Sequence, residues 1–163
     1  MKILTIILII LIAALGSAAA YYLISPAFVV IESNEASPVN TMITEVVQMP
    51  TMPTAQEMSD ATILSTAYFK PHDHDVEGKA LLIDDNGKKI VRFEDFDTVN
   101  GPELHVYLST DLDAKDYIDL GEIKATRGNV NYDVPMGIDV NKYNKVLVWC
   151  EPFSVLFSYA ELE

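Results

Sequence analysis

The chain has 163 residues and a formal net charge of −13 at pH 7, with 24 acidic and 11 basic side chains. Nucleic-acid binding depends on clustered lysine and arginine, so this charge balance argues against a nucleic-acid partner and against a basic membrane-surface patch. The length suits one domain with additional segments.

The first segment is an apolar run without charge between Lys2 and Glu32. A helix needs about 20 apolar residues to cross a bilayer, so residues 1–31 are expected to form a membrane anchor, with residues 3–24 in contact with lipid. The lysine before the run favours a cytoplasmic N-terminus and an extracytoplasmic C-terminal domain. The alanines at 18–20 leave a cleaved signal peptide open as the alternative.

The composition changes after the apolar run. Residues 32–60 are rich in Thr, Met, Ser, Glu and proline, and Pro38, Pro50 and Pro53 oppose regular structure. This segment is expected to be a flexible stalk between the membrane and a folded domain.

Residues 61–163 predict an all-β domain, an antiparallel sandwich or barrel. Asn86-Gly87 is a strong hairpin signal between two apolar runs. In 103–110 the apolar side chains alternate with His105 and Tyr107, which is typical of a strand with one buried face. The expected strands are 61–69, 78–84, 88–93, 103–110, 117–125, 128–135, 145–151 and 153–162.

Cys150 is the only cysteine, and it lies in an expected strand with apolar side chains on both faces. Such a strand is typically central, with Val146, Val148 and Cys150 on one face and Leu147 and Trp149 on the other. One cysteine cannot form an internal disulfide, so three interpretations stay open. The thiol is a core side chain, a redox or ligand group, or half of an intermolecular disulfide.

The spaced motifs of this domain resemble the DM-thirteen domain, also called the electron-transfer DM domain, over about residues 65–162. The matching residues are His74 and Gly78, Phe96, Asn100-Gly101-Pro102, Val106 to Ser109, Leu120-Gly121, Tyr132 with Pro135, and Trp149-Cys150 with Phe153 and Phe157. The resemblance implies a β-sandwich that takes part in extracytoplasmic electron transfer with Cys150 as the redox residue.

The resemblance also sets expectations for the site. His74 is expected close to Cys150, near a surface opening, because both belong to the motif, and Trp149 is a further candidate for cofactor contact. An unknown extracytoplasmic redox or protein partner is implied, and the protein is expected to be an electron-transfer or binding module more than a catalyst. The alternative is a binding or adhesion module in which Cys150 is structural and the loop at 100–102 makes contacts.

Two histidines in "PHDHD" are candidate metal ligands. If this segment is a strand, His72 and His74 lie on one face and could bind copper or zinc with a third ligand. Haem or copper is possible as the redox group, but no complete motif implies either. No histidine follows Cys150, which argues against a standard blue-copper site, and the Cys-x-x-Cys-His motif of covalent haem attachment is absent.

Overall fold

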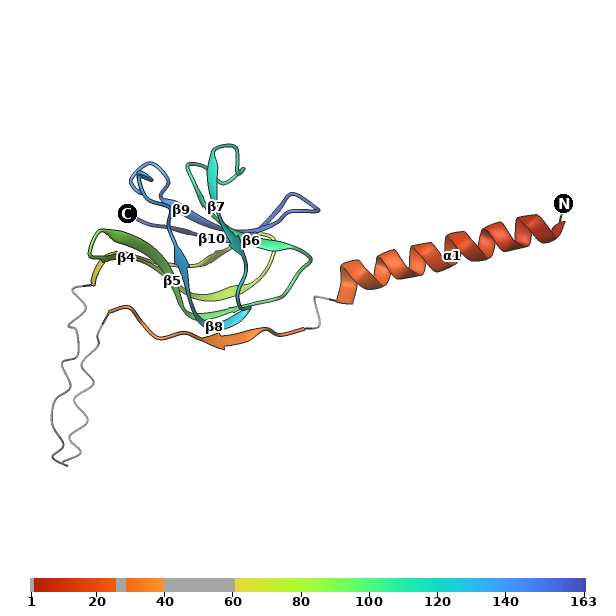
Figure 1. Ribbon diagram of the computed structural model, residues 1–163, viewed down its shortest axis with the longest axis horizontal. Helices are drawn as coiled ribbons and strands as arrows, with labels where there is room; N and C mark the ends of the chain where they lie inside the picture. The colour runs from red at the N-terminus through yellow and green to blue at the C-terminus, as the bar shows by residue number, and fades with distance from the viewer. Residues whose placement is uncertain (1, 26–28, 40–60) are drawn as a thin grey trace, which may run out of the picture.

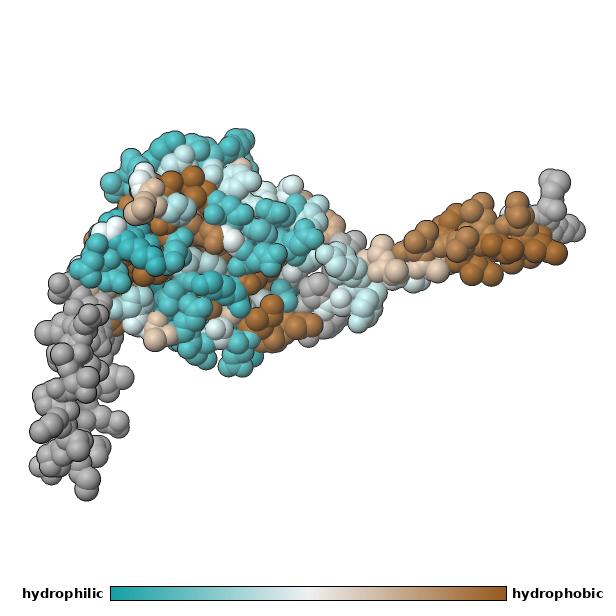
Figure 2. All heavy atoms as spheres, viewed as in Figure 1, coloured by the Kyte–Doolittle hydropathy of each residue, from teal (hydrophilic) through white to brown (hydrophobic). Residues whose placement is uncertain are grey.

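The computed structural model describes residues 2–25, 29–39 and 61–163, and it contains one apolar helix and a two-sheet sandwich (Figure 1). Helix α1, Lys2–Ile24, projects away from the sandwich, and its stretch Ile3–Tyr22 is long and apolar enough to cross a membrane. The surface of α1 is hydrophobic over most of its visible length and is paler near the sandwich, whereas much of the visible sandwich surface is hydrophilic (Figure 2). Such a helix fits a membrane span and also fits a signal sequence.

The described part of the domain consists of two five-stranded sheets, which confirms the expected sandwich. One sheet, here sheet A, has the order β1-β8-β5-β4-β2, and the other, sheet B, has the order β3-β10-β9-β6-β7. The strands are β1 Glu32–Asn34, β2 Thr62–Tyr68, β3 Lys70–Pro71, β4 Val76–Asp85, β5 Lys88–Thr98, β6 Leu104–Ser109, β7 Tyr117–Glu122, β8 Arg127–Asp133, β9 Lys145–Cys150 and β10 Val155–Glu161.

The hairpin between β4 and β5 forms where the sequence predicts it. Asn86 and Gly87 have φ values of 53° and 88°, and two successive positive φ values are the mark of a type I′ turn. Asp84 accepts a hydrogen bond from the backbone of Gly87 at 2.7 Å and pairs with Lys89. The turn therefore fixes the register of the two longest strands.

The main core lies between the sheets and contains the inward residues of each alternating strand. Leu104, Val106 and Leu108 of β6 face this core, and Tyr107 belongs to a second cluster on the outer face of sheet B. The same alternation places Val146, Val148 and Cys150 in the main core and Leu147 and Trp149 with the outer cluster. Both expected alternations are confirmed, and β9 is the central strand of sheet B.

The segment after α1 differs from the expectation of an unpacked stalk beginning at residue 32. Residues 32–34 form β1, which pairs in parallel with β8, so that Glu32 lies opposite Arg127. The carbonyl of Ile31 accepts hydrogen bonds from the backbones of Thr126 and Arg127. Short strands of this kind carry no periodic signal, which explains why the composition alone suggests a stalk. Residues 40–60 lie outside the described residues.

Candidate functional site

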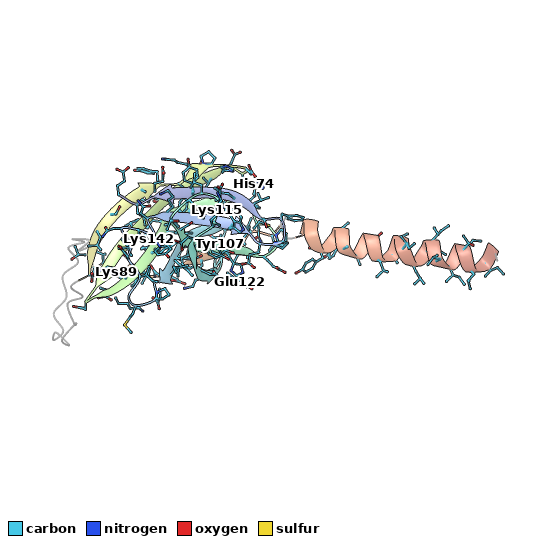
Figure 3. The ribbon with its side chains drawn as sticks, turned by 90° about the horizontal axis from the view of Figure 1, so that it is seen from above. His74, Lys89, Tyr107, Lys115, Glu122 and Lys142 are labelled. Atoms are coloured by element: carbon cyan, nitrogen blue, oxygen red, sulfur yellow. The ribbon has the colours of Figure 1, made fainter. Side chains whose placement is uncertain are left out.

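Cys150 and His74, 76 positions apart in the chain, line the same pocket at one end of the sandwich. The pocket has a volume of about 240 Å³, and its lining is His74, Asn100, Gly101, Pro102, Cys150, Phe153, Val155 and Phe157. His74 lies toward the end of the sandwich from which α1 projects (Figure 3). The expectation that the motif histidine and the motif cysteine are neighbours agrees with this arrangement, whereas the chemical role of each stays a prediction.

Cys150 is the last residue of β9 and is 1% exposed. Its Sγ donates a hydrogen bond to the carbonyl of Pro102 at 3.2 Å. Burial raises the pKa of the Cys150 thiol, and a backbone hydrogen bond at Phe153 only partly opposes this effect. The side chain is therefore a protonated thiol at neutral pH, and nucleophilic reactivity is low in that form.

His74 is half-buried and is held by β10. Its ring packs on the ring of Phe157, with 3.9 Å between the centroids, and its backbone N–H donates to the Phe157 carbonyl at 3.2 Å. These contacts fix the imidazole at the wall of the pocket.

The His-x-His segment is not a strand, so the condition for His72 and His74 to share one strand face is not met. Strand β3 ends at Pro71, and residues 72–74 are bends. His72 lines a different cavity, which it shares with Trp149, and its Nδ1 lies 3.1 Å from the carboxylate of Asp73. Trp149 lies on the opposite face of β9 from Cys150, with the outer cluster, and its contact with a cofactor stays a prediction.

The pocket is a poor fit to a blue-copper centre or to an enclosed haem. Blue copper needs one cysteine and two histidines, and among the described residues this pocket is lined by Cys150 and one histidine, His74. Pockets that enclose a drug-sized ligand usually measure about 300–1,000 Å³, which exceeds the volume found here. The pocket suits a small group or a side chain of a partner.

Gly101 lies in the wall of the pocket without the positive φ that would explain a glycine. A Cβ at this position would lie 2.7 Å from Cζ of Phe157, which is closer than carbon atoms can approach without displacement. The glycine is therefore required by the close approach of the Phe157 ring to the backbone.

Gly101→Ala is expected to lower the free energy of unfolding by about 1–3 kcal/mol, because added atoms in a packed site force neighbouring side chains out of place. Urea denaturation of the variant measures the loss. In the double variant with Phe157→Leu, which removes the ring, the Gly101→Ala cost should shrink. An equal cost in both backgrounds would contradict the steric explanation.

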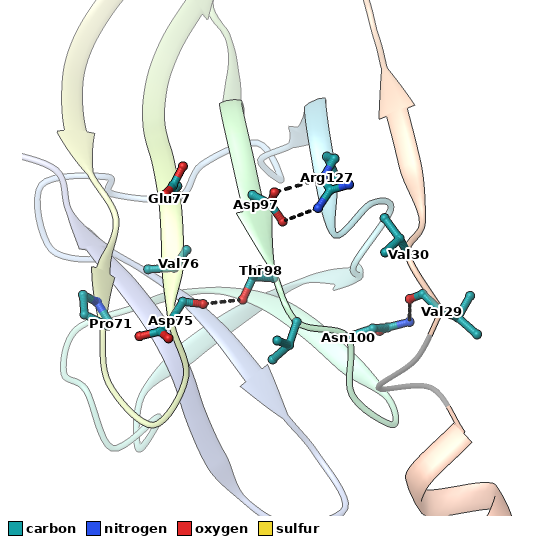
Figure 4. Close-up of a pocket in the computed structure, with 11 residues that line it drawn as sticks. Val29, Val30, Pro71, Asp75, Val76, Glu77, Asp97, Thr98, Asn100 and Arg127 are labelled. Carbon is teal, nitrogen blue, oxygen red and sulfur yellow. Dashed lines mark hydrogen bonds and ion pairs between the residues drawn. The ribbon is translucent and has the colours of Figure 1, made fainter.

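A second cavity, of about 560 Å³, lies beside the residues that follow the helix (Figure 4). Asn100 donates to the Val29 carbonyl at 3.1 Å, Thr98 donates to the Asp75 carbonyl at 3.1 Å, and Arg127 pairs with Asp97 at 2.9 Å. Asn100 lines both cavities, so the Cys150 pocket lies close to the point where the chain leaves α1.

A separate cluster of possible metal ligands, His105, Asp119 and Glu151, lies on the outer face of sheet B. No motif in the sequence indicates this cluster. Their ligand-type atoms all lie within 4.8 Å of one another. The residues are far apart in the chain and carry no shared motif, so only the pairing of β6 with β7 and β9 brings them together.

Residues 68–162 match the family model described as Electron transfer DM13. No curated protein and no solved structure matches the chain. The matched region includes Cys150 and His74 of the first pocket, together with β9 and β10, which contribute residues to its lining. Because the match covers more than half of the sequence, the chain belongs to the electron-transfer DM13 family.

Proposed function

We propose that the protein is an electron-transfer protein held at the extracytoplasmic face of a membrane, with Cys150 as the residue through which electrons pass. The observation that carries the proposal is that Cys150 and His74, from opposite ends of the family domain, line one apolar pocket. A redox-active side chain in an electron-transfer domain needs protection from solvent and also access for a partner group. This pocket provides both protection and access.

The chemistry of the pair follows from the protonation state of the thiol. Burial raises the pKa of Cys150, so an electron that leaves its sulfur for an external one-electron acceptor must be accompanied by a proton. His74 is the titratable partner that the pocket wall offers for this proton. The partner group enters through the apolar mouth at Phe153, which is exposed.

Cys150→Ser is expected to abolish electron exchange while it changes stability little, since a serine hydroxyl can still donate to the Pro102 carbonyl. Protein-film voltammetry on the purified full chain in detergent checks the exchange, and urea denaturation checks the fold. His72→Gln, at the histidine that lines another cavity, is the matched control and should retain the wild-type signal. An unchanged signal in Cys150→Ser would refute the role of the thiol.

Membrane anchoring by α1 is the second part of the proposal. The hydroxyl of Tyr22 donates to Glu103 at 3.1 Å, and Asn100 contacts Val29, so the pocket faces the membrane surface if α1 spans the bilayer. We expect the chain to stay in the membrane fraction after high-salt and carbonate washes. Recovery of a soluble mature chain that begins near Tyr21 would instead identify a cleaved signal sequence.

One observation favours a second function, an extracytoplasmic binding module with a structural cysteine. Cys150 is almost fully enclosed and its pKa is raised, which is typical of an inert core thiol. Under this alternative, Cys150→Ser destabilises the domain by a few kcal/mol and leaves binding intact. The voltammetry and denaturation measurements on the same variant therefore distinguish the two functions.

A further inference from the structure

We infer that the outer face of sheet B carries a binding site for a divalent first-row transition-metal ion, with His105, Asp119 and Glu151 as its ligands. The site goes beyond the proposed electron-transfer function. It lies on the opposite side of β9 from Cys150, because Cys150 faces the core between the sheets whereas Tyr107, which contacts Glu151, belongs to the outer cluster.

The donor atoms lie close enough together to be gathered around one small metal ion. The Nδ1 atom of His105 lies 3.0 Å from Oδ2 of Asp119 and 3.8 Å from Oε1 of Glu151. Two ligands of a tetrahedral ion with bonds of about 2.0–2.2 Å are separated by roughly 3.4 Å. The observed separations lie on either side of this value, so an ion can be accommodated by small rotations of the side chains.

Three elements bring the ligands together. His105 lies on β6, Asp119 on β7, and Glu151 directly follows β9. The pairing of β6 with β7 shifts register between His105 and Tyr107, and Gly121 of β7 has a φ of 107°. This irregularity places Asp119 opposite Tyr107, which lies two residues from the histidine and therefore on the same face of β6.

Both carboxylates are oriented by other groups of the protein. Asp119 Oδ1 accepts a hydrogen bond from the backbone of Gly121 at 2.7 Å, and Glu151 Oε1 accepts one from the hydroxyl of Tyr107 at 2.5 Å. The Tyr107 ring is buried and stacks on Tyr117, with 4.1 Å between the centroids. Such outer hydrogen bonds hold ligands in position before an ion arrives and are typical of functional metal sites.

The charge at this face favours a cation. Within the described residues, the only basic group at ion-pair distance from Asp119 or Glu151 is His105 itself, so two carboxylates share at most one positive charge. An imidazole nitrogen suits zinc, copper, nickel or iron, whereas magnesium and calcium prefer oxygen ligands alone. The two carboxylates are partly exposed, which gives an ion access and leaves room for a water as a fourth ligand.

The test is calorimetric titration of the full chain in detergent with Zn²⁺, and with Mg²⁺ in a parallel titration. We expect one Zn²⁺ per chain, with Mg²⁺ at least tenfold weaker, and a loss of at least tenfold in zinc affinity in His105→Gln. His72→Gln is the matched control, because His72 also pairs with an aspartate, Asp73, at 3.1 Å. Equal binding by wild type and His105→Gln would overturn the site.

A second measurement covers the case in which a variant fails to fold. Co²⁺ bound to wild type should give visible d–d bands without the strong near-ultraviolet absorption of a thiolate ligand, and Cys150→Ser should give the same spectrum. No Co²⁺ or Zn²⁺ binding by wild type, or a thiolate band lost in Cys150→Ser, would refute the assignment. Because Cys150→Ser is expected to keep the metal site, failure of the electron-transfer proposal and failure of this inference are separately visible.

Discussion

Gly78→Ala is expected to lower the free energy of unfolding by about 2–6 kcal/mol, from backbone strain of about 1–3 kcal/mol and overpacking of about 1–3 kcal/mol. Gly78 has a φ of 103°, a conformation that L side chains rarely adopt. A Cβ there would also lie 2.7 Å from three backbone atoms of β5, which are the carbonyl oxygens of Glu94 and Asp95 and the Cα of Phe96.

The neighbouring backbone cannot move away easily, because the pairing of β4 with β5 shifts register at this point and both strands are central in sheet A. Urea denaturation of the full chain in detergent measures the loss. Gly137→Ala is the matched control, since Gly137 has a φ of 84° with open space around its Cβ position. It should show the strain alone, and a loss as large as that of Gly78→Ala would argue against the steric part of the explanation.

The Gly78 variant is also expected to affect the pocket that His74 and Cys150 line. Gly78 follows His74 by four residues, and the connecting segment is tied to β5 by the bond from Thr98 to the Asp75 carbonyl. A displaced β4 would therefore shift His74 relative to Cys150.

The sequence predicts the β domain well because its strands alternate. The outward and inward faces of β6 and β9 follow from period-two patterns, and the Asn86-Gly87 turn follows from its need for positive φ. The shared pocket of Cys150 and His74 could not be predicted in the same way. No local sequence pattern links β9 to the segment after β3, and only the family resemblance suggests that the two residues lie close together.

Other features lie beyond sequence reasoning for physical reasons. Strand β1 has three residues, too few for a periodic signal, and its parallel partner β8 is 95 positions away. His105, Asp119 and Glu151 each look like an ordinary surface residue, because their proximity depends on strand order and on a register shift. Gly101 illustrates a third case, in which the residue is required by a packed ring that is distant in the sequence.

Arg92→Met is expected to lower the free energy of unfolding by about 3–5 kcal/mol, the usual cost of removing one partner of a buried ionic network. Arg92 is 4% exposed on the outer face of sheet A. Its Nη1 donates to the carbonyls of Glu35 and Ala36 and to the side chain of Asn131, and its Nε donates to Glu94 at 2.8 Å. Methionine fills similar space but leaves these acceptors without their donor.

Arg127→Met is the matched control, because Arg127 pairs with Asp97 at 2.9 Å with both side chains about half exposed. Exposed pairs contribute about 0–1 kcal/mol, so urea denaturation should separate the two arginines clearly. Equal losses in the two variants would show that the burial of Arg92 does not increase its contribution to the free energy of unfolding.

The pH dependence of stability gives an independent check. Burial acts to raise the pKa of Glu94, but hydrogen bonds from Arg92 and Lys79 overcome this and hold it below its ordinary value. A lowered carboxyl pKa contributes stability that is present above the unfolded pKa, about 4.3 for glutamate, and is lost as the pH falls through the folded pKa. Arg92→Met should therefore lose less stability on acidification than wild type does.

Arg92 also helps to hold the residues that follow the helix against the domain. The carbonyls that it binds belong to residues 35 and 36, which directly follow β1, and Glu35 accepts a further bond from the backbone of Asn131 at 2.8 Å. Without Arg92, residues 29–39 should detach from β8 more often and become a site of limited proteolysis. If α1 spans a membrane, this docking keeps the Cys150 pocket at the membrane surface. Proteolysis of Arg92→Met at the wild-type rate would show instead that β1 alone holds the segment.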